Sequence, residues 1–439
     1  MSQIQPYESI PIIEAPEDYR FRTAEFLAEM YAQHGPVFRQ ATPLGRDIVY
    51  LIGPEANRYV MVNGRQKFSH QIGWGEMFGI DQLLGRGLLT MDGSAHDQHR
   101  KLMNPAFTLS YMERYLPLMH GVIRRRVAQW AESGEVNIYE EMRKITFDIA
   151  AEALTGLVAG EEVDTFRKIF VGLLNGPEDM SPETTEEEYM AAIVPLQLQL
   201  YSLLIPKIEE RRLNPTDDVF GLLVQARNAD GEALSNEQII SHVNILLVAG
   251  HETSTSLSTW LLYLLNQHPD YTRRILDEQA EVLTPGAEPT LEEIKRMKVL
   301  DNALSEADRL YPPVTNGPRG VLEDFDFHGY HVPAGSLLLY SIAGSHVLPH
   351  IFANPTQFDP DRFAPPREEQ KKNPYALVGF GGGPRICIGI NFAQVEIKAL
   401  TTYILRNYNL ELVPDQQITL VYDVTSWPLN GIKMKVTAK

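Results

Sequence analysis

The sequence is short of cysteine: Cys387 is the only one among 439 residues. A single cysteine excludes a disulfide within the chain and a structural zinc site built on several thiolates, and it fits a reducing cytoplasm. Basic residues are also few, 39 against 57 acidic ones, which gives a formal net charge of −18. A surface that neutralises phosphates must be basic, so this balance argues against general nucleic-acid binding.

Long apolar runs, internal repeats and low-complexity tracts are missing as well. Without a run of 18 apolar residues, no membrane span is expected. The first 19 residues hold no Lys or Arg and no long apolar core, so a signal peptide is not expected either. Hydrophobic residues make up 44% and charged residues 22%, which is ordinary for a globular chain. We therefore expect a soluble, acidic, cytoplasmic protein.

Apolar periodicity predicts a mainly α fold with small β regions. The β-branched stretch 47–52 predicts a strand, and Pro- and Gly-punctuated short strands such as 336–341 follow residue 310. Residues 68–89 contain five glycines among large apolar side chains, which predicts a long functional loop. Helices are expected near 95–132, 138–156, 163–175, 186–212, 235–267 and 391–407.

The helix expected at 235–267 breaks local rules at its centre. Ser235 and Gln238 form a capping-box pattern, and Pro269 follows the other end. The helix is apolar around most of its circumference, which predicts burial, yet Gly250 and Glu252 lie halfway along it. A glycine in a helix and a buried glutamate both cost stability, and such violations are typical of functional sites.

The sequence around Cys387 carries the strongest signal for chemistry. A lone cysteine is usually a small buried hydrophobe. Here, however, glycines allow backbone amides to point at the sulfur, Arg385 adds positive charge, and a helix is expected to begin just after Gly389. These surroundings favour a thiolate that binds a metal centre. A dinucleotide-binding turn at Gly379-x-Gly381 is the competing interpretation, and Pro384 at the third glycine position argues against it.

The segment Phe380–Gly389 matches every fixed position of the pattern F-x-x-G-x-R-x-C-x-G. This pattern resembles the haem-binding signature of the cytochrome P-450 superfamily of haem-thiolate monooxygenases. Three further motifs occur in the family's order: Ala249-Gly250-His251-Glu252-Thr253, Glu306-Ala307-Asp308-Arg309 and Pro360-Asp361-Arg362-Phe363. The resemblance, to the soluble bacterial type, covers about residues 95–400. It implies a long central helix over a buried haem and one domain over 1–439, with β-richer parts at about 1–90 and 310–439.

The resemblance implies a cofactor and its protein contacts. Cys387 would be the axial thiolate ligand of the iron in haem b, with O2 as co-substrate. Two buried propionates require paired cations. The family's propionate partners match His96, Arg100, Arg319 and Arg385, and further haem contacts fall on Phe380, Ala249 and Gly389. The H-x-x-H spacing at 96–99 could also suggest a metal site, but no third ligand is visible.

The same resemblance assigns the catalytic and structural residues. Thr253 would hydrogen-bond oxygen at the haem, and Glu252 would relay protons through water. His251 is interpreted as a spacer and not as a ligand. The family's structural Glu–Arg–Arg network, which fixes the loop carrying the cysteine, matches Glu306, Arg309 and Arg362.

Substrate and electron donor follow less directly. We expect hydroxylation or epoxidation of a lipophilic molecule such as a terpenoid or fatty acid, in a pocket lined by Trp74, Phe78, Leu84, Val314 and Trp427. Arg86 and His70 are candidates for anchoring a substrate carboxylate. No flavin or iron–sulfur module fits within the chain, so a ferredoxin or flavodoxin with an NAD(P)H-dependent reductase is expected, docking near Lys371 and Lys372.

Two other functions remain open from the sequence. A peroxide-using or isomerase-type haem-thiolate enzyme would need no redox partner, but such relatives commonly lose the acid–alcohol pair that Glu252 and Thr253 form here. A haem-based ligand sensor or carrier is the non-enzymatic alternative, and no sensor or output module is visible in the sequence.

Overall fold

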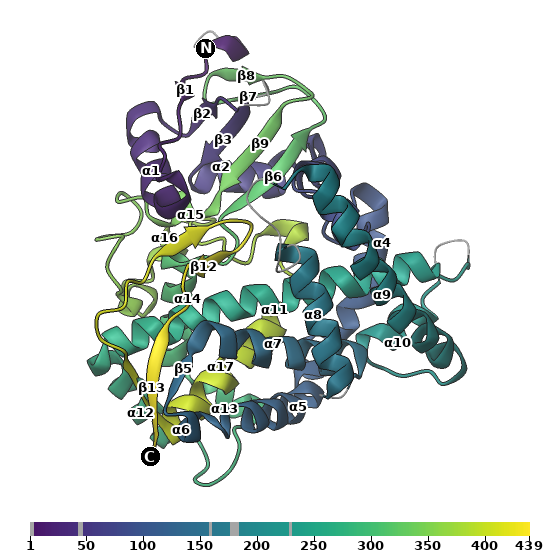
Figure 1. Cartoon of the computed structure of the whole chain (residues 1–439). Helices are drawn as coiled ribbons and strands as arrows, with labels where there is room; N and C mark the ends of the chain where they lie inside the picture. Colours follow the sequence, from purple (N-terminus) through teal and green to yellow (C-terminus); the bar gives the residue numbers. More distant parts are fainter. Residues whose placement is uncertain (1–3, 43–46, 158–159, 176–183, 228–230) are drawn as a thin grey trace.

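The computed structural model describes residues 4–42, 47–157, 160–175, 184–227 and 231–439. Helices dominate and the strands form small sheets, which confirms the expected fold class (Figure 1). The helices are α1 (Tyr19–His34), α2 (Pro54–Arg58), α3 (Ile80–Leu84), α4 (Gly93–Met103), α5 (Leu109–Val127), α6 (Trp130–Ser133), α7 (Ile138–Thr155), α8 (Glu161–Asn175), α9 (Glu186–Leu213), α10 (Val219–Gln225), α11 (Asn236–Gln267), α12 (Pro269–Val282), α13 (Leu291–Arg296), α14 (Lys298–Leu310), α15 (Ile342–His346), α16 (Glu369–Lys372) and α17 (Ile390–Asn407).

The main sheet joins the two β-richer parts of the chain. The strands are β1 (Ile12–Ile13), β2 (Val37–Gln40), β3 (Ile48–Ile52), β4 (Phe68–Ser69), β5 (Glu135–Asn137), β6 (Asn316–Val321), β7 (Phe325–Phe327), β8 (Tyr330–Val332), β9 (Leu337–Ser341), β10 (Tyr408–Leu412), β11 (Leu420–Tyr422), β12 (Ser426–Pro428) and β13 (Lys433–Ala438). Six of them form a sheet in the order β1-β2-β3-β9-β6-β4. In its middle, β3 and β9 pair in parallel with Tyr50 opposite Leu339. This pairing brings residues 337–341 beside the N-terminal strands, and the pairing of β6 with β9 adds the segment around residue 320 to the same sheet.

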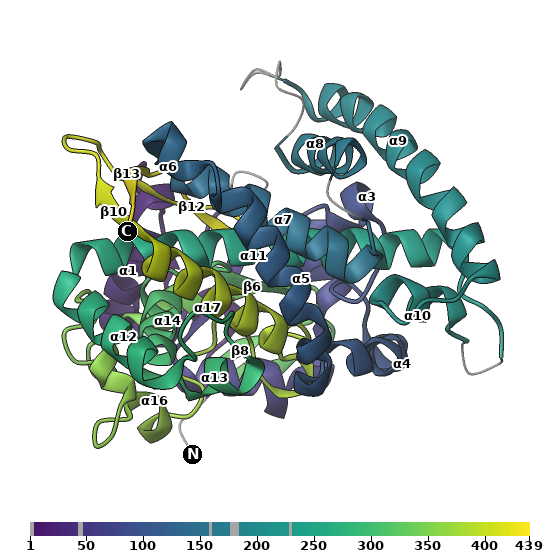
Figure 2. The same cartoon turned by 90° about the horizontal axis from the view of Figure 1, so that it is seen from below.

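The long central helix α11 crosses the helical body of the molecule (Figures 1 and 2). Ser235 and Gln238 form the expected capping box, with each side chain bound to the other residue's backbone N–H. At the far end Pro269 is the first residue of α12, a position where the missing N–H of proline costs nothing. The helix packs along α7 and contacts α14 and α17, which buries most of its circumference.

Residues 68–89 are not the long loop that the sequence suggested. The segment contains β4, a π-helical turn at Gln71–Met77 and α3. Gly79 and Gly85 lie at the two ends of α3 with φ of 68° and 85°, so these glycines terminate a helix. The large apolar residues of the segment are buried in the main core, which stabilises helical turns where glycine spacing indicated a loop.

The single helix expected at 95–132 is broken into three. α4 ends at Met103, a short 3-10 turn follows at Asn104–Phe107, and α5 begins after Thr108, whose backbone is extended. Pro105 explains the break, because a proline inside a helix removes one N–H and clashes with the preceding turn. The helices expected at 138–156, 163–175, 186–212 and 391–407 correspond to α7, α8, α9 and α17.

One helix comes close to the description of a membrane span. Glu187–Leu213 of α9 is long and apolar enough to cross a bilayer by length and composition, and only 17% of its apolar window is buried. Polar but uncharged residues such as Gln197 and Ser202 interrupt the apolar run, which is why sequence inspection found no span. A single helix of this kind is weak evidence for a span. In the structure α9 packs on α8 and α10 at the periphery of the molecule (Figure 2).

Candidate haem site

The segment that carries Cys387 is a tight loop closed by its own backbone. The N–H of Cys387 donates to the carbonyl of Phe380 at 2.8 Å, and the N–H of Gly381 donates to the carbonyl of Val378 at 2.8 Å. Gly381 and Gly383 have φ of 73° and 61°, a conformation that side chains rarely adopt. The glycines are therefore required by the turn that presents the cysteine just before α17.

The Cys387 side chain is accessible, although many protein atoms lie around its thiol. Burial raises the pKa of the thiol, against the lowering effects of the Gly389 amide and the charge of Arg100. The Gly389 amide and Arg100 are therefore the two groups beside the sulfur that would stabilise a thiolate. The nearby cation is Arg100, whereas Arg385 donates to the carbonyl of Met91 at 2.6 Å.

Accessible surface also occurs in the middle of the otherwise buried helix α11. Ala249 is exposed and Thr253 is half-buried, whereas residues 239–247 and 254–262 of the same helix are buried. A space therefore lies beside this turn of α11. The helix packs on α17, and its Ser254 lies beside Glu396 of α17, so this turn is close to the loop that carries Cys387.

Glu252 is held in a network that the sequence did not reveal. Its Oε1 lies 3.0 Å from Nε2 of His251 and 3.5 Å from Nε of Arg143 on α7. Burial tends to raise the pKa of Glu252, but His251 and Arg143 together hold it below its ordinary value. Arg143 in turn donates to the hydroxyl of Tyr139 at 2.7 Å. His251 is therefore a direct partner of the acid, which corrects its interpretation as a spacer.

The hydroxyl of Thr253 points along its own helix. Oγ1 donates to the carbonyl of Ala249 at 2.6 Å. The hydroxyl hydrogen is thus engaged, and the lone pairs of Oγ1 remain able to accept a hydrogen bond. This orientation places an acceptor at the accessible turn of α11.

Arginine and histidine side chains gather close to Cys387 in a chain of strong negative charge. His96 and Arg100 come from α4, Arg319 from β6, and Arg385 from the cysteine loop. Burial, together with repulsion from Arg319 and Arg100, lowers the pKa of Arg385 to about 10 against the opposing effect of the nearby Asp92. Arg319 is buried, and burial lowers its pKa against the opposing effects of Tyr340 and Asp92.

The cluster has a further member in His70. Burial holds the pKa of His70 well below its ordinary value, and repulsion from Arg319, Arg385 and His96 adds to this effect. His70 therefore lies among the propionate candidates, which argues against its use as a substrate anchor. Arg86, the other candidate anchor, is exposed and donates to the side chain of Gln71 at 2.6 Å.

These residues fit haem b. Within the described part of the chain, neither Arg100 nor Arg319 has a carboxylate within ion-pair distance, so two buried or half-buried cations are left to match two propionates. Cys387 supplies a soft sulfur ligand suited to iron. The small side chain of Ala249 leaves room for a flat ring beside α11.

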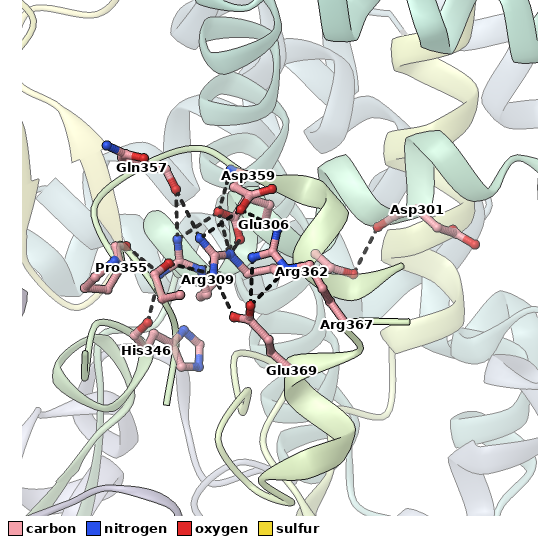
Figure 3. A network of polar contacts seen from close by, with 12 residues as sticks. Asp301, Glu306, Arg309, His346, Pro355, Gln357, Asp359, Arg362, Arg367 and Glu369 are labelled. Atoms are coloured by element: carbon pink, nitrogen blue, oxygen red, sulfur yellow. Dashed lines mark hydrogen bonds and ion pairs between the residues drawn. The ribbon is translucent and has the colours of Figure 1, made fainter. Parts of the chain in front are cut away.

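A buried ionic network joins α14 to the segment of residues 353–369 (Figure 3). Glu306 on α14 binds Nε of Arg309 at 2.8 Å and Nε of Arg362 at 3.0 Å, and all three side chains are fully buried. Arg362 also reaches Glu369 at 2.8 Å. Because every charge has a partner, the network rigidly fixes residues 353–369 against α14.

Two contacts connect this network to the cysteine loop. Arg309 donates to the carbonyl of His346 at 3.0 Å, and the imidazole Nε2 of His346 accepts the N–H of Val378 at 2.9 Å. Asp308, the neighbour of Arg309, is buried against Gly379: a Cβ added to Gly379 would lie 2.0 Å from its carboxylate. Burial raises the pKa of Asp308 to about 7. The base of the loop therefore rests on the end of α14.

The expected pocket residues separate into two groups. Trp74 and Leu84 are buried and Phe78 is half-buried, with the rings of Trp74 and Phe78 5.6 Å apart. Asn244 of α11 donates to the carbonyl of Leu84 at 3.1 Å, and Gln197 of α9 donates to the carbonyls of residues 82 and 83. This segment therefore forms an apolar layer between α9 and the first half of α11.

Val314 and Trp427 lie elsewhere. Val314 packs at the junction of two core clusters, between α14 and β6. Trp427 stacks on Tyr139 at 6.3 Å, and its indole N–H donates to Asp423 at 3.1 Å. Trp427 therefore contacts Tyr139, the residue whose hydroxyl accepts a hydrogen bond from Arg143, and does not belong to the layer formed by Trp74 and Leu84.

The lysines proposed for docking lie on α16. Both Lys371 and Lys372 are exposed, and Lys371 pairs with Glu368. Arg367 nearby pairs with Asp359 and Glu369. The charge of this surface is therefore mixed.

Sequence reasoning named His70 and His251 without the contacts that the structure gives them, and it missed Arg143. His251 stood inside a recognised motif, and its position next to a glutamate was an available signal. Arg143 carries no such signal, because its contact with Glu252 depends on the packing of α7 against α11. His70 joins the cations only because β4 pairs with β6, opposite residues 320 and 321.

Comparisons with known proteins agree with this geometry. A sequence model of the family described as cytochrome P-450 matches residues 17–436. A Synechocystis sp. protein of the cytochrome P-450 120 type is 32% identical over 420 residues, covering 94% of this chain and 92% of its own length. A sterol 14alpha-demethylase from Mycolicibacterium vanbaalenii is 27% identical, covering 84% and 82%. The solved structure of retinoic-acid-bound cyanobacterial CYP120A1 superposes with a TM-score of 0.85 at 31% identity, covering 98% of this chain and 100% of that one.

Proposed function

The chain belongs to the cytochrome P-450 family and is a haem-thiolate monooxygenase, and we propose that Cys387 is its axial ligand within one domain over residues 1–439. One observation carries the ligand assignment: Arg100, a member of the arginine and histidine cluster, lies close to Cys387, the only cysteine in the sequence. Haem, when bound, supplies O2 activation and transfer of one oxygen atom to the substrate. Its propionates would be held by His96, Arg100, Arg319 and Arg385.

Phe380 and Gly389 would flank the haem on the sulfur side and Ala249 on the opposite side. The closed backbone of the loop supports the first part, since it fixes Phe380 and Cys387 relative to each other. The accessible surface of Ala249 supports the second. Glu306, Arg309 and Arg362 take no part in the chemistry in this proposal, and they keep the cysteine loop in place through residues 346 and 378.

Protons would reach the reaction centre through Glu252 and Thr253. Glu252 is 8% exposed and has a lowered pKa, so at neutral pH it is a carboxylate able to take up and pass on a proton. The oxygen of Thr253 accepts the next hydrogen bond because its own hydrogen is engaged by Ala249. The pair would thereby carry protons from the α7 side of the helix to its accessible turn.

The absorbance spectrum of the reduced, carbon-monoxide-bound protein tests the ligand. A strongly red-shifted Soret band reports a thiolate, and we expect it in the wild type and in Ser256→Ala, a control on α11 that leaves the loop untouched. Cys387→His replaces the sulfur by a nitrogen ligand, so the shifted band should disappear while haem remains bound. A red-shifted band in that variant would contradict the assignment.

Thr253→Ala tests the proton route. We expect the fraction of electrons recovered in product to fall and hydrogen peroxide to rise, because the acceptor at the turn is lost. Thr259→Ala is a matched control, since the Thr259 hydroxyl also donates to a carbonyl one turn back, that of residue 255. Equal coupling in Thr253→Ala and Thr259→Ala would remove Thr253 from the mechanism.

The substrate we propose is an elongated lipophilic molecule such as a terpenoid or fatty acid. The layer of Trp74, Phe78 and Leu84 supports an apolar ligand, and CYP120A1, which is similar over its whole length, has been solved with retinoic acid. Val314 and Trp427 are proposed as outer contacts. A screen for substrate-induced spin-state shifts with retinoic acid, a sterol, a fatty acid and a sugar should give shifts with one or more of the lipids only. A shift with the sugar alone would refute the proposal.

Electrons would come from a ferredoxin or flavodoxin with an NAD(P)H-dependent reductase, and the enzyme would work in the cytoplasm. Exposed Lys372 supports a contact with an acidic donor, although the surrounding pairs reduce the net charge. Lys372→Glu should slow reduction by ferredoxin without changing the rate with dithionite. The alternative, a peroxide-using enzyme, would be favoured if peroxide supported turnover as well as the ferredoxin system does.

A further inference from the structure

The hydrogen bonds of His251 determine how many hydrogens its ring carries. Nδ1 lies 2.8 Å from the carbonyl oxygen of Leu247, and Nε2 lies 3.0 Å from the carboxylate of Glu252. A carbonyl can only accept, so Nδ1 must carry a hydrogen. If Nε2 carried none and Glu252 were ionised, a ring lone pair would face a carboxylate lone pair at hydrogen-bond distance. The contact at 3.0 Å therefore requires one more proton, either on Nε2 or on Glu252.

The ring is held firmly in this position. His251 is fully buried, and the ring of Phe147 meets it edge to face at 5.1 Å. The Thr146 hydroxyl, also on α7, donates to the backbone carbonyl of His251 at 3.2 Å. These contacts come from uncharged groups, so they fix the ring without supplying or removing a proton.

Arg143 decides on which partner the proton rests. Its Nε is 3.5 Å from the same Oε1 of Glu252 that faces His251, and this positive charge favours the carboxylate over the carboxylic acid. Among the residues that the structure describes, the other titratable groups facing the pair are Tyr139, which accepts from Arg143, and Glu140, which lies 3.5 Å from Arg143. The proton is therefore mainly on Nε2, and Glu252 is the group through which it leaves.

We infer that His251 and Glu252 share one proton in addition to the hydrogen on Nδ1, and that His251 is the proton store for delivery past Thr253. The delivery part rests on the proposed function of Glu252 and Thr253. In the transfer the Nε2–H bond breaks and an Oε–H bond forms on Glu252, leaving a neutral imidazole that keeps its Nδ1 hydrogen. The acid then releases its proton on the Thr253 side, and solvent, which reaches the 10%-exposed Glu252 side chain, returns a proton to the pair.

Nitrogen NMR of the haem-loaded, reduced, carbon-monoxide-bound protein tests the store directly. With ¹⁵N-labelled histidine, the His251 signals are assigned by their loss in His251→Gln. At pH 7 both ring nitrogens should resonate as protonated, and in Glu252→Gln the ring should become neutral with hydrogen on Nδ1 alone. A ring nitrogen without hydrogen in the wild type would overturn the inference, whatever the catalytic variants show.

Coupling measurements test whether the store is used. The amide of His251→Gln can still donate to Glu252 but has no proton to release, so it separates hydrogen bonding from proton supply. We expect product per electron to fall by about tenfold in His251→Gln, a modest part of the range for general acid catalysis, with an unchanged carbon-monoxide spectrum. His120→Gln is the control, because His120 is a buried histidine on α5 that binds the carbonyl of Pro289.

The outcomes separate the inference from the proposed function. Wild-type coupling in His251→Gln would mean that the histidine only positions Glu252, and the store would be refuted. Unchanged coupling in Thr253→Ala would refute the proposed proton route, while the NMR result would still report the shared proton. A shift in the pH profile of turnover in His251→Gln, absent in His120→Gln, is the further result expected of a proton donor.

Discussion

Asp308 makes the stability of this protein depend on pH near neutrality. The side chain is 3% exposed, and burial against Gly379 raises its pKa from 3.8 to about 7. The unfolded chain ionises Asp308 above pH 3.8, whereas the folded chain keeps it neutral up to about pH 7. Between these values the unfolded state binds fewer protons, so the free energy of unfolding falls by about 1.4 kcal/mol per pH unit. Above pH 7 the loss is constant at roughly 4 kcal/mol, and below pH 3.8 it is absent.

The variant Asp308→Asn keeps the shape of the side chain and removes its titration. The cost of burying the amide is the same at every pH, so it cancels when the pH dependence is compared. Relative to wild type, the free energy of unfolding of the variant should rise by about 2 kcal/mol between pH 5.5 and pH 7.5. Urea unfolding followed by tryptophan fluorescence measures this difference at each pH.

The exposed Asp277→Asn on α12 controls for the loss of one negative charge from an acidic chain. Parallel pH curves for Asp308→Asn and wild type would refute the reasoning, because a buried carboxyl that costs nothing to ionise cannot have a raised pKa. A curve that continues to rise above pH 8 would show that burial raises the pKa of Asp308 further than the structure indicates.

Three further predictions concern unfolding measured in urea. Burial holds the pKa of His242, whose Nε2 lies 2.6 Å from Nδ1 of His99, at about 3. The free energy of unfolding should therefore fall as the pH drops below 6.5, by about 2 kcal/mol at pH 5. His242→Phe should flatten this slope, and an unchanged slope would contradict the prediction. Arg362→Leu leaves Glu306 buried with one partner fewer and should lower the free energy of unfolding by about 3–5 kcal/mol. A decrease below 1 kcal/mol would show that the network does not stabilise the fold. Ser235→Ala removes the cap of α11 and should cost about 1 kcal/mol, with no change in the carbon-monoxide spectrum.

The sequence predicts the central helix and the cysteine loop well because both depend on local rules. The capping box of α11 is formed by two side chains three residues apart. The closed loop at Cys387 needs glycines at positive φ, and those glycines are visible in the sequence. Helix boundaries that depend on proline, such as the break near residue 105, are also local, and here the signal was present but not used.

The remaining features depend on contacts between distant segments. The helical turns of 71–84 form because Trp74 and Leu84 are buried under α9 and α11, which no local pattern of glycines indicates. The cation beside the Cys387 sulfur is also set by distant contacts, because Arg100 comes from α4, far from the cysteine loop in the sequence. Arg143 reaches Glu252 only through helix packing, so the acid was identified without the group that lowers its pKa.

The cations around Cys387 also affect how the amount of folded protein is controlled. Arg100 and Arg319 both repel Arg385, and the two propionates of bound haem would relieve that repulsion only in the folded state. A ligand that binds only the folded state stabilises it by RT ln(1 + [L]/Kd), so stability rises with the concentration of free cofactor. The cellular supply of haem would thereby set the fraction of chains that escape proteolysis. These charges would thereby link the amount of stable protein to the supply of its cofactor.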